Sequence, residues 1–548
     1  MKKLLSLLLS FMLLFSIASC GASGGDTEGD GGGVTDGENS GAGDVNGSDE
    51  TEPREIVIEL SEATQYGLLG VSTAGKITAG IKDGTDEIDR EVALRNGEAA
   101  RIANVTVRYK YLPDIPENAA YNNVNRIKTE TRIYSPDSTD IYYNHSIDIV
   151  IAVLSNAFAN LYEDGTAGET LFRFNADDYD GSPREGYYYD YMRSISLSSD
   201  KIYAVASDYG LDFARMFTAI PTNIALLRTA SQKLGNSAEN DAIEEITEIV
   251  KSGDWTFDTL ARYANAAFVE KLSENSASLT DAGEVIGFGV GSNHMIPALA
   301  LLNSSSASTV TRTPIDGDPN RYFIDLPDDN RALFDICAEL NELFNEPSVY
   351  TLKEKSVLKN SGNNQTLLRE FNEGRMLFGE ITTLCMLEGT VKPADDPLLF
   401  LPVPTYKKAS DIGYNTTVSP FAKVFAISAK TDVFRECALF LNYQSTHSED
   451  IAKDYLIDNL GIRGDGELEE AAKEMLDIIL SSVRDSFLPI WEQICYFGKI
   501  DFDPYLLTYY YVCDSHYELS DFEEYYRDYV SLIRKELDKL MSKWEQLD

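Results

Sequence analysis

The chain has 548 residues, and its 89 acidic residues against 47 basic ones give a formal net charge of −42. This balance argues against nucleic acid as a partner, because phosphate binding needs clustered Lys and Arg side chains. The length exceeds what one hydrophobic core supports, so we expect two lobes or more.

The N-terminus has the pattern of an export signal. Two lysines precede an apolar run, Leu4–Ile17, that is short for a bilayer span and typical of a signal peptide. The following Ala18-Ser19-Cys20 resembles a bacterial lipobox, in which the cysteine is acylated and becomes the mature N-terminus; an ordinary secretory signal is the alternative. We predict a signal peptide over residues 1–19 and a lipidated Cys20 that anchors an extracytoplasmic protein to the cell membrane.

The residues after Cys20 favour a tether. Gly21–Pro53 holds eleven glycines and nine acids, with neither Lys nor Arg. Such a segment buries too little apolar surface to offset the entropy lost on ordering. We therefore predict a flexible acidic linker over residues 20–53.

Two stretches in the first half favour strands. Asn104–Tyr111 alternates between polar and β-prone side chains. Ser146–Leu154 is a continuous apolar run, which we interpret as a parallel strand buried on both faces. Ligands of open α/β sheets bind outside the carboxyl ends of strands. Asn156 and Phe158, just beyond this run, are therefore candidate ligand contacts.

A helix pair with clear ends lies in the middle of the chain. The segment 241–250 places its isoleucines on one face, and Gly253 ends that helix. Thr256 is a good N-cap for the next helix, and Asp258 lies where the helix dipole favours an acid. Trp255, between the two helices, is expected to be a packing anchor.

The second half alternates strands and helices. Strands are expected at 285–290 and 376–381, and helices at 294–302, at 331–344 and up to Gly374. Pro402 and Pro404 suit a rigid extended connector between lobes. A polar loop with Tyr414 and Asn415 follows, and then a strand and a helix within 421–443. The C-terminal part, residues 465–548, has helical periodicity.

Several of these stretches resemble the carbohydrate-type family 1 extracellular solute-binding proteins of bacterial ABC importers. Lys201–Tyr209 resembles a strand and loop of that family, and Ser252–Leu260 resembles its "GkWTwdel" motif. Met216–Leu227 resembles the strand that crosses between its lobes. The likeness is strongest from Phe371 to Ser428.

The resemblance implies an α/β, two-lobed periplasmic-binding-protein-like (type II) fold, with a cleft between the lobes and a helical C-terminal part. Lobe one would comprise residues 54–220 and 402–460. Lobe two would comprise residues 221–401 and 461–548.

The resemblance also implies a function and a site. The chain would capture a small solute, most directly a sugar or oligosaccharide, by lobe closure and deliver it as a monomer to ABC permease subunits. Peptides and other small polar solutes stay open as ligands. The expected ligand contacts are Asn156, Phe158, Asp208, Tyr209, Glu380, Tyr414 and Asn415.

The sequence contains no evident catalytic motif. Its four histidines are not spaced as metal ligands, and its five cysteines after Cys20 include no CxxC pair. We predict no enzyme activity, no cofactor and no metal site. Two alternatives are a surface lipoprotein that captures glycans or adheres without a permease, and a glycosidase using two of the many carboxylates.

Overall fold

The structure, a computed structural model, describes a little under two thirds of the chain in eighteen segments. They are residues 52–61, 86–112, 120–132, 138–161, 186–197, 201–211, 213–235, 241–270, 284–290, 295–305, 311–315, 318–325, 327–350, 365–387, 399–462, 466–485, 490–491 and 519–547. The predicted signal peptide, Cys20 and the linker up to residue 51 lie outside these residues.

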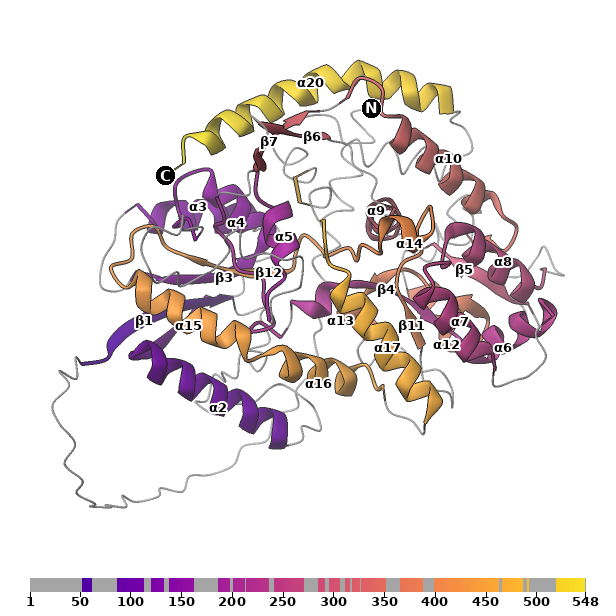
Figure 1. The fold of residues 1–548 in the computed structure, drawn as a ribbon, viewed down its shortest axis with the longest axis horizontal. Coiled ribbons are helices and arrows are strands. Elements are labelled where there is room, and N and C mark those ends of the chain that lie inside the picture. The colour runs from indigo at the N-terminus through magenta and orange to yellow at the C-terminus, as the bar shows by residue number, and fades with distance from the viewer. Residues whose placement is uncertain are drawn as a thin grey trace.

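The first lobe is built on a four-stranded sheet of order β12-β3-β1-β2. Its strands are β1 (Arg54–Ser61), β2 (Val105–Leu112), β3 (Ile141–His145) and β12 (Lys423–Ile427). β1 is parallel to β2 and β3, whereas β12 arrives from the other lobe and runs antiparallel to β3. The helices of this lobe are α2 (Asp86–Ala103), α3 (Ala120–Glu130), α4 (Ser146–Val153), α5 (Tyr189–Ser194), α15 (Phe434–Thr446) and α16 (Glu449–Asn459) (Figure 1).

The predicted strand at 146–154 is wrong, because these residues form the helix α4. The true strand, β3, comes directly before it. Nearly every residue of α4 is buried, so its sequence is apolar all round and lacks the polar face that marks a surface helix. A short apolar run fits a buried strand and a buried helix equally well. The predicted strand at 104–111 is confirmed as β2.

The second lobe is built on a six-stranded sheet of order β10-β4-β9-β5-β8, with β11 also paired to β4. Its strands are β4 (Thr218–Thr222), β5 (Ile286–Gly289), β8 (Val349–Tyr350), β9 (Met376–Phe378), β10 (Thr382–Thr383) and β11 (Leu399–Leu401). β5, β8 and β9 are parallel, and β4 runs antiparallel to its partners. The predicted strands around 285–290 and 376–381 are thus confirmed.

The helices of the second lobe surround this sheet (Figure 1). They are α6 (Ile224–Lys233), α7 (Asp241–Lys251), α8 (Phe257–Ala267), α9 (Met295–Ser304), α10 (Arg331–Asn345), α12 (Gln365–Asn372), α13 (Leu384–Leu387), α14 (Ala409–Ile412) and α17 (Glu467–Ser481). A separate hairpin pairs β6 (Thr311–Ile315) with β7 (Asp318–Asp325). The 27-residue helix α20 (Leu519–Glu545) ends the described chain.

The joint between α7 and α8 forms as the sequence predicts. Gly253 has a φ of +79°, and a Cβ there would lie 2.4 Å from the backbone nitrogen of Ser410. The Thr256 hydroxyl caps α8 by accepting from the backbone N–H of Thr259. Trp255 is fully buried, and its indole N–H donates to the carbonyl of Pro402 at 2.8 Å. Trp255 therefore fixes the return connector to the second lobe.

Within the described segments, no helix is both long enough and apolar enough to span a bilayer.

Candidate functional site

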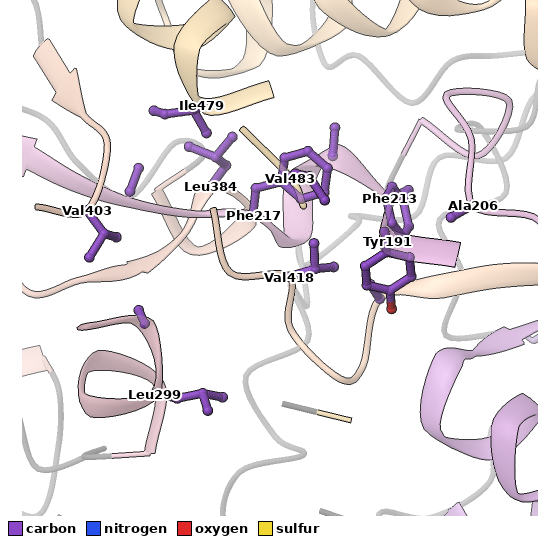
Figure 2. Close-up of a cluster of buried hydrophobic side chains, with 14 of the residues drawn as sticks. Tyr191, Ala206, Phe213, Phe217, Leu299, Leu384, Val403, Val418, Ile479 and Val483 are labelled. Carbon is purple, nitrogen blue, oxygen red and sulfur yellow. The ribbon is translucent and has the colours of Figure 1, made fainter. Parts of the chain in front are cut away.

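The chain passes between the lobes along segments that lie side by side. Phe217 and Val418 form an antiparallel bridge, and the N–H of Thr218 donates to the carbonyl of Thr417 at 3.0 Å. A further segment joins them where the N–H of Thr416 donates to the carbonyl of Ser482 at 2.8 Å. Figure 2 shows Phe217 and Val418 in the same apolar cluster as Leu384 and Val483. We call residues 216–218, 415–419 and 482–485 the crossover segments.

The Asn415 side chain fastens these segments together. Its amide nitrogen donates to the carbonyls of Asn303 and Asp485, each at 3.0 Å. Its amide oxygen accepts from the backbone N–H groups of Arg484 and Asp485 at 3.2 and 3.0 Å. Asn415 is 5% exposed, and these bonds use its two donors and both lone pairs of its oxygen. Asn415 therefore joins two crossover segments, the expected hinge between the lobes, and we call these four hydrogen bonds the clamp.

The carboxyl ends of the parallel strands in both lobes point to the crossover segments. β3 ends at His145, which pairs with Lys423 just after the return crossover. β9 leads into Glu380, between Gly379, whose N–H donates to Pro221, and Thr382, which pairs with Ala219 of β4. Because ligands of open α/β sheets bind at such carboxyl ends, these two edges define the candidate site.

Three side chains lie together at the first-lobe edge. The Phe421 ring is 47% exposed, and among the described residues it is the only aromatic side chain in the set of exposed large hydrophobics. It meets the His145 ring edge to face, with centroids 5.9 Å apart. His145 Nδ1 lies 3.8 Å from Oδ2 of Asp148 in the first turn of α4.

Asp148 has an unusual environment for a carboxylate. It is 1% exposed, and neither of its oxygens has a hydrogen-bond partner among the described residues. A buried carboxylate without donors is costly. His145 Nδ1, at 3.8 Å, lies beyond hydrogen-bond distance and forms an ion pair with Asp148 only when the imidazole is protonated.

The structure separates Asn156 and Phe158 from this edge. Asn156 is exposed, follows the opposite end of α4 from His145, and adopts a φ of +53°. Phe158 is buried, bridges Ser428 beyond the far end of β12 and packs edge-on against Tyr142. The mistaken strand at 146–154 explains the displacement, because the carboxyl end of the sheet strand is His145.

Asp208 and Tyr209 lie inside the first lobe. The Tyr188 hydroxyl donates to Oδ1 of Asp208 at 2.7 Å. Burial raises the pKa of Asp208 to about 7, the hydrogen bond from Tyr188 opposes this rise, and the nearby Glu449 adds to it. Tyr209 is fully buried and stacks on Phe425 with centroids 4.8 Å apart, and the guanidinium of Arg95 lies over its ring, 5.1 Å from the centroid.

The remaining predicted residues belong to the second lobe and the hinge. Tyr414 is half-buried, and its hydroxyl donates to the carbonyl of Val250 at 2.8 Å. Burial raises the pKa of this hydroxyl. Glu380 is half-buried at the second-lobe edge. Of the seven predicted residues, only Glu380 stands at one of the two carboxyl edges; Tyr414 and Asn415 adjoin the hinge.

Sequence reasoning missed His145, Asp148 and Phe421. A signal was present, since Tyr142 and Tyr143 form a β-prone pair that ends in the polar Asn144 and His145. An exposed aromatic directly before a buried strand is a second signal. Within the described segments, no group of three His, Cys, Asp or Glu side chains is arranged to hold a metal ion.

Comparison with known proteins gives likeness of fold without likeness of sequence. No protein-family model and no curated protein sequence matches the chain. A de novo designed cysteine esterase matches with a TM-score of 0.50 and 13% identity, over 89% of this chain and 100% of that one. A family 1 extracellular solute-binding protein from Bifidobacterium longum subsp. infantis has a TM-score of 0.48 and 14% identity, over 91% and 100%. The GacH receptor of Streptomyces glaucescens has a TM-score of 0.45 and 13% identity, over 88% of this chain and 98% of that one.

The chain has the two-lobed periplasmic-binding-protein-like fold. The predicted fold class is thereby confirmed, whereas identities this low carry no function from those proteins to this one. The designed protein's name refers to a cysteine esterase. Here Cys437 is buried, and burial raises the pKa of its thiol well above the usual value, which disfavours the reactive thiolate.

Proposed function

We propose that this protein is an extracytoplasmic substrate-binding lipoprotein that captures a sugar or oligosaccharide and delivers it to an ABC permease. One observation carries the choice of ligand: the exposed ring of Phe421 packs against His145, whose Nδ1 lies 3.8 Å from the buried carboxylate of Asp148, an acid without a hydrogen-bond partner among the described residues. An aromatic face suits the C–H surface of a sugar ring, and a carboxylate accepts hydrogen bonds from adjacent hydroxyl groups.

Lobe closure supplies the mechanism. A ligand that touches the first-lobe edge at Phe421 and the second-lobe edge at Glu380 contacts both only when the lobes approach. Its binding energy therefore favours the closed state, which a permease can distinguish from the open one. The paired crossover segments allow this motion, because a few backbone torsions at element ends can absorb a hinge rotation.

The seven residues predicted from the sequence stay proposals as ligand contacts. Glu380 is supported by its place at the second-lobe edge, and Tyr414 by its partial exposure next to the hinge. Buried residues such as Phe158 and Tyr209 would act through the shape of the first lobe. To these we add Phe421, His145 and Asp148.

Calorimetric titration tests the ligand class. Maltotriose, raffinose and cellobiose would be titrated alongside the tripeptide trialanine. We expect saturable binding of at least one sugar and about tenfold weaker binding of it by Phe421→Ala, the loss that corresponds to a stacking contact of about 1.4 kcal/mol. Leu94→Ala, which removes an exposed apolar side chain on α2, is the matched control and should bind as wild type. Binding of trialanine alone, or unchanged affinity in Phe421→Ala, would contradict the proposal.

A further inference from the structure

Helix α20 contacts both lobes, one near each of its ends (Figure 1). A helix of 27 residues is a rod about 40 Å long, because each residue adds about 1.5 Å. Figure 1 shows it running from α10 of the second lobe to the region of α3 and α5 in the first.

The N-terminal half of α20 is fixed to the second lobe. Phe522 and Tyr526 both pack edge to face on Phe334 of α10, at centroid distances of 5.6 and 5.3 Å. The Tyr526 hydroxyl donates to the carbonyl of Pro327 at 3.1 Å. Glu523 pairs with Arg331 of α10 at 3.0 Å. Packing, a hydrogen bond and an ion pair thus act at the same place.

The C-terminal end of α20 is fixed to the first lobe by a second set of contacts. Trp544 packs edge to face on Tyr203 and on Trp491, at 5.4 and 5.9 Å. The ammonium group of Lys201 donates to the carbonyls of Trp544, Glu545 and Leu547. A cation at this position satisfies the free carbonyls and complements the negative end of the helix dipole. We call the contact of Trp544 with Lys201 and Tyr203 the latch.

A repulsive charge pair lies next to the latch. Lys543 of α20 lowers the pKa of Lys128 on α3, second to the effect of burial, so the two ammonium groups repel each other. At the other end Glu523 pairs with Arg331 and Arg527.

A helix does not stretch, so the lobes cannot rotate freely while both ends stay attached. We propose that α20 is a strap that holds the interlobe angle, and that breaking the latch frees the lobes to rotate. This inference goes beyond the proposed function, because it concerns the resistance to lobe motion whatever the ligand.

Distance measurement between the lobes, without any ligand, tests the strap. Spin labels would be attached through unnatural amino acids at position 94, exposed on α2, and position 234, exposed at the C-cap of α6, so that the native cysteines stay untouched. Double electron–electron resonance should give a narrow distance distribution in the wild type. Trp544→Ala and Lys201→Met should each give a broader or a second distribution. Lys535→Met, an exposed lysine on the same helix, is the matched control and should match the wild type.

Hydrogen exchange shows whether the latch has opened. In Trp544→Ala the backbone amides of residues 540–547 should exchange at least about tenfold faster, while those around Phe522 should stay protected. An unchanged distance distribution together with faster exchange at the latch would overturn the proposal, because the end would then be free without any effect on the lobes. Unchanged distances and unchanged exchange in both variants would overturn it as well, since the latch contacts would then hold nothing. Lys201→Met keeps the aliphatic stem, which guards against a folding defect.

Discussion

At the residue scale, Asp208 makes the stability of the fold depend on pH. Burial raises its pKa to about 7, above the value of about 3.9 expected in the unfolded chain. Between these values the folded state binds more protons, so stability falls as the pH rises from about 4 to 7, by roughly 4 kcal/mol at 1.36 kcal/mol per pKa unit. In Asp208→Asn this slope should disappear, because an amide does not ionise. Calorimetric melting at pH 5, 6 and 8 measures it.

The hydrogen bond from Tyr188 provides an internal control for that experiment. The Tyr188 hydroxyl favours the ionised form of Asp208, so Tyr188→Phe should move the pH-dependent loss to higher pH. Melting temperatures of Asp208→Asn that run parallel to the wild type across this range would contradict the assignment.

The buried pair of Glu59 and Arg126 gives a second prediction. The Glu59 side chain is 1% exposed, and its two oxygens accept from Arg126 at 2.7 Å each. Arg126→Met would leave a buried carboxylate with the Thr139 hydroxyl at 3.3 Å and Lys110 at 3.5 Å, and should destabilise the protein by about 3 kcal/mol. Arg101→Met, which breaks an exposed pair with Glu98, is the matched control. Urea unfolding measures the loss in free energy of unfolding for both variants. Equal losses would contradict a larger contribution from the buried pair.

At the element scale, the crossover segments depend on one side chain. Asn415→Ala would leave four backbone groups around it without their bonds, and unsatisfied buried groups cost about 1–3 kcal/mol each. We expect the free energy of unfolding, measured with urea, to fall by several kcal/mol. The backbone amides of residues 482–485 should also exchange faster. Asn265→Ala, which removes an exposed side chain on α8, should have little effect. Protection at 482–485 that equals the wild type would contradict the clamp.

Elements with local signals were predictable from sequence, and those set by tertiary contacts were not. Thr256 and Gly253 act through neighbours within a few residues, so their roles follow from the residue types. The helix α4 is apolar on every side because the protein covers it completely, which erases the period of 3.6 residues. Asn415 has partners up to 112 residues away in sequence, and that information is not local.

The same distinction applies to the candidate site. The position of Glu380 at the sheet edge could be predicted because a buried strand ends just before it. His145 was missed because the strand was placed a few residues too late, which moved the predicted edge to Asn156. The orphaned state of Asp148 depends on surrounding burial that no sequence pattern expresses.

At the scale of the whole molecule, the predicted lobe limits stay a proposal that the sheets refine. Residues 402–414 contact the second lobe through Trp255 and Val250, so the return crossing there falls at the crossover segment 415–419. α20 begins on the second lobe and ends on the first, so a single limit at 461 does not describe the C-terminal part.

The membrane anchor is a separate prediction at this scale. If Cys20 is acylated, the protein fractionates with membranes, and Cys20→Ser should release it while sugar binding stays unchanged. Metabolic labelling with a radioactive fatty acid measures the modification. Incorporation of label into Cys20→Ser would contradict a lipid at this residue.

Sugar-driven lobe closure is the central claim, and small-angle X-ray scattering of the mature protein tests it most directly. Scattering would be recorded with and without the sugar that calorimetry identifies, at saturating concentration. We expect a smaller radius of gyration for the wild type with sugar, and an unchanged radius of gyration for Asp148→Asn at the same sugar concentration. An unchanged radius of gyration in wild-type protein that calorimetry shows to be saturated would contradict it.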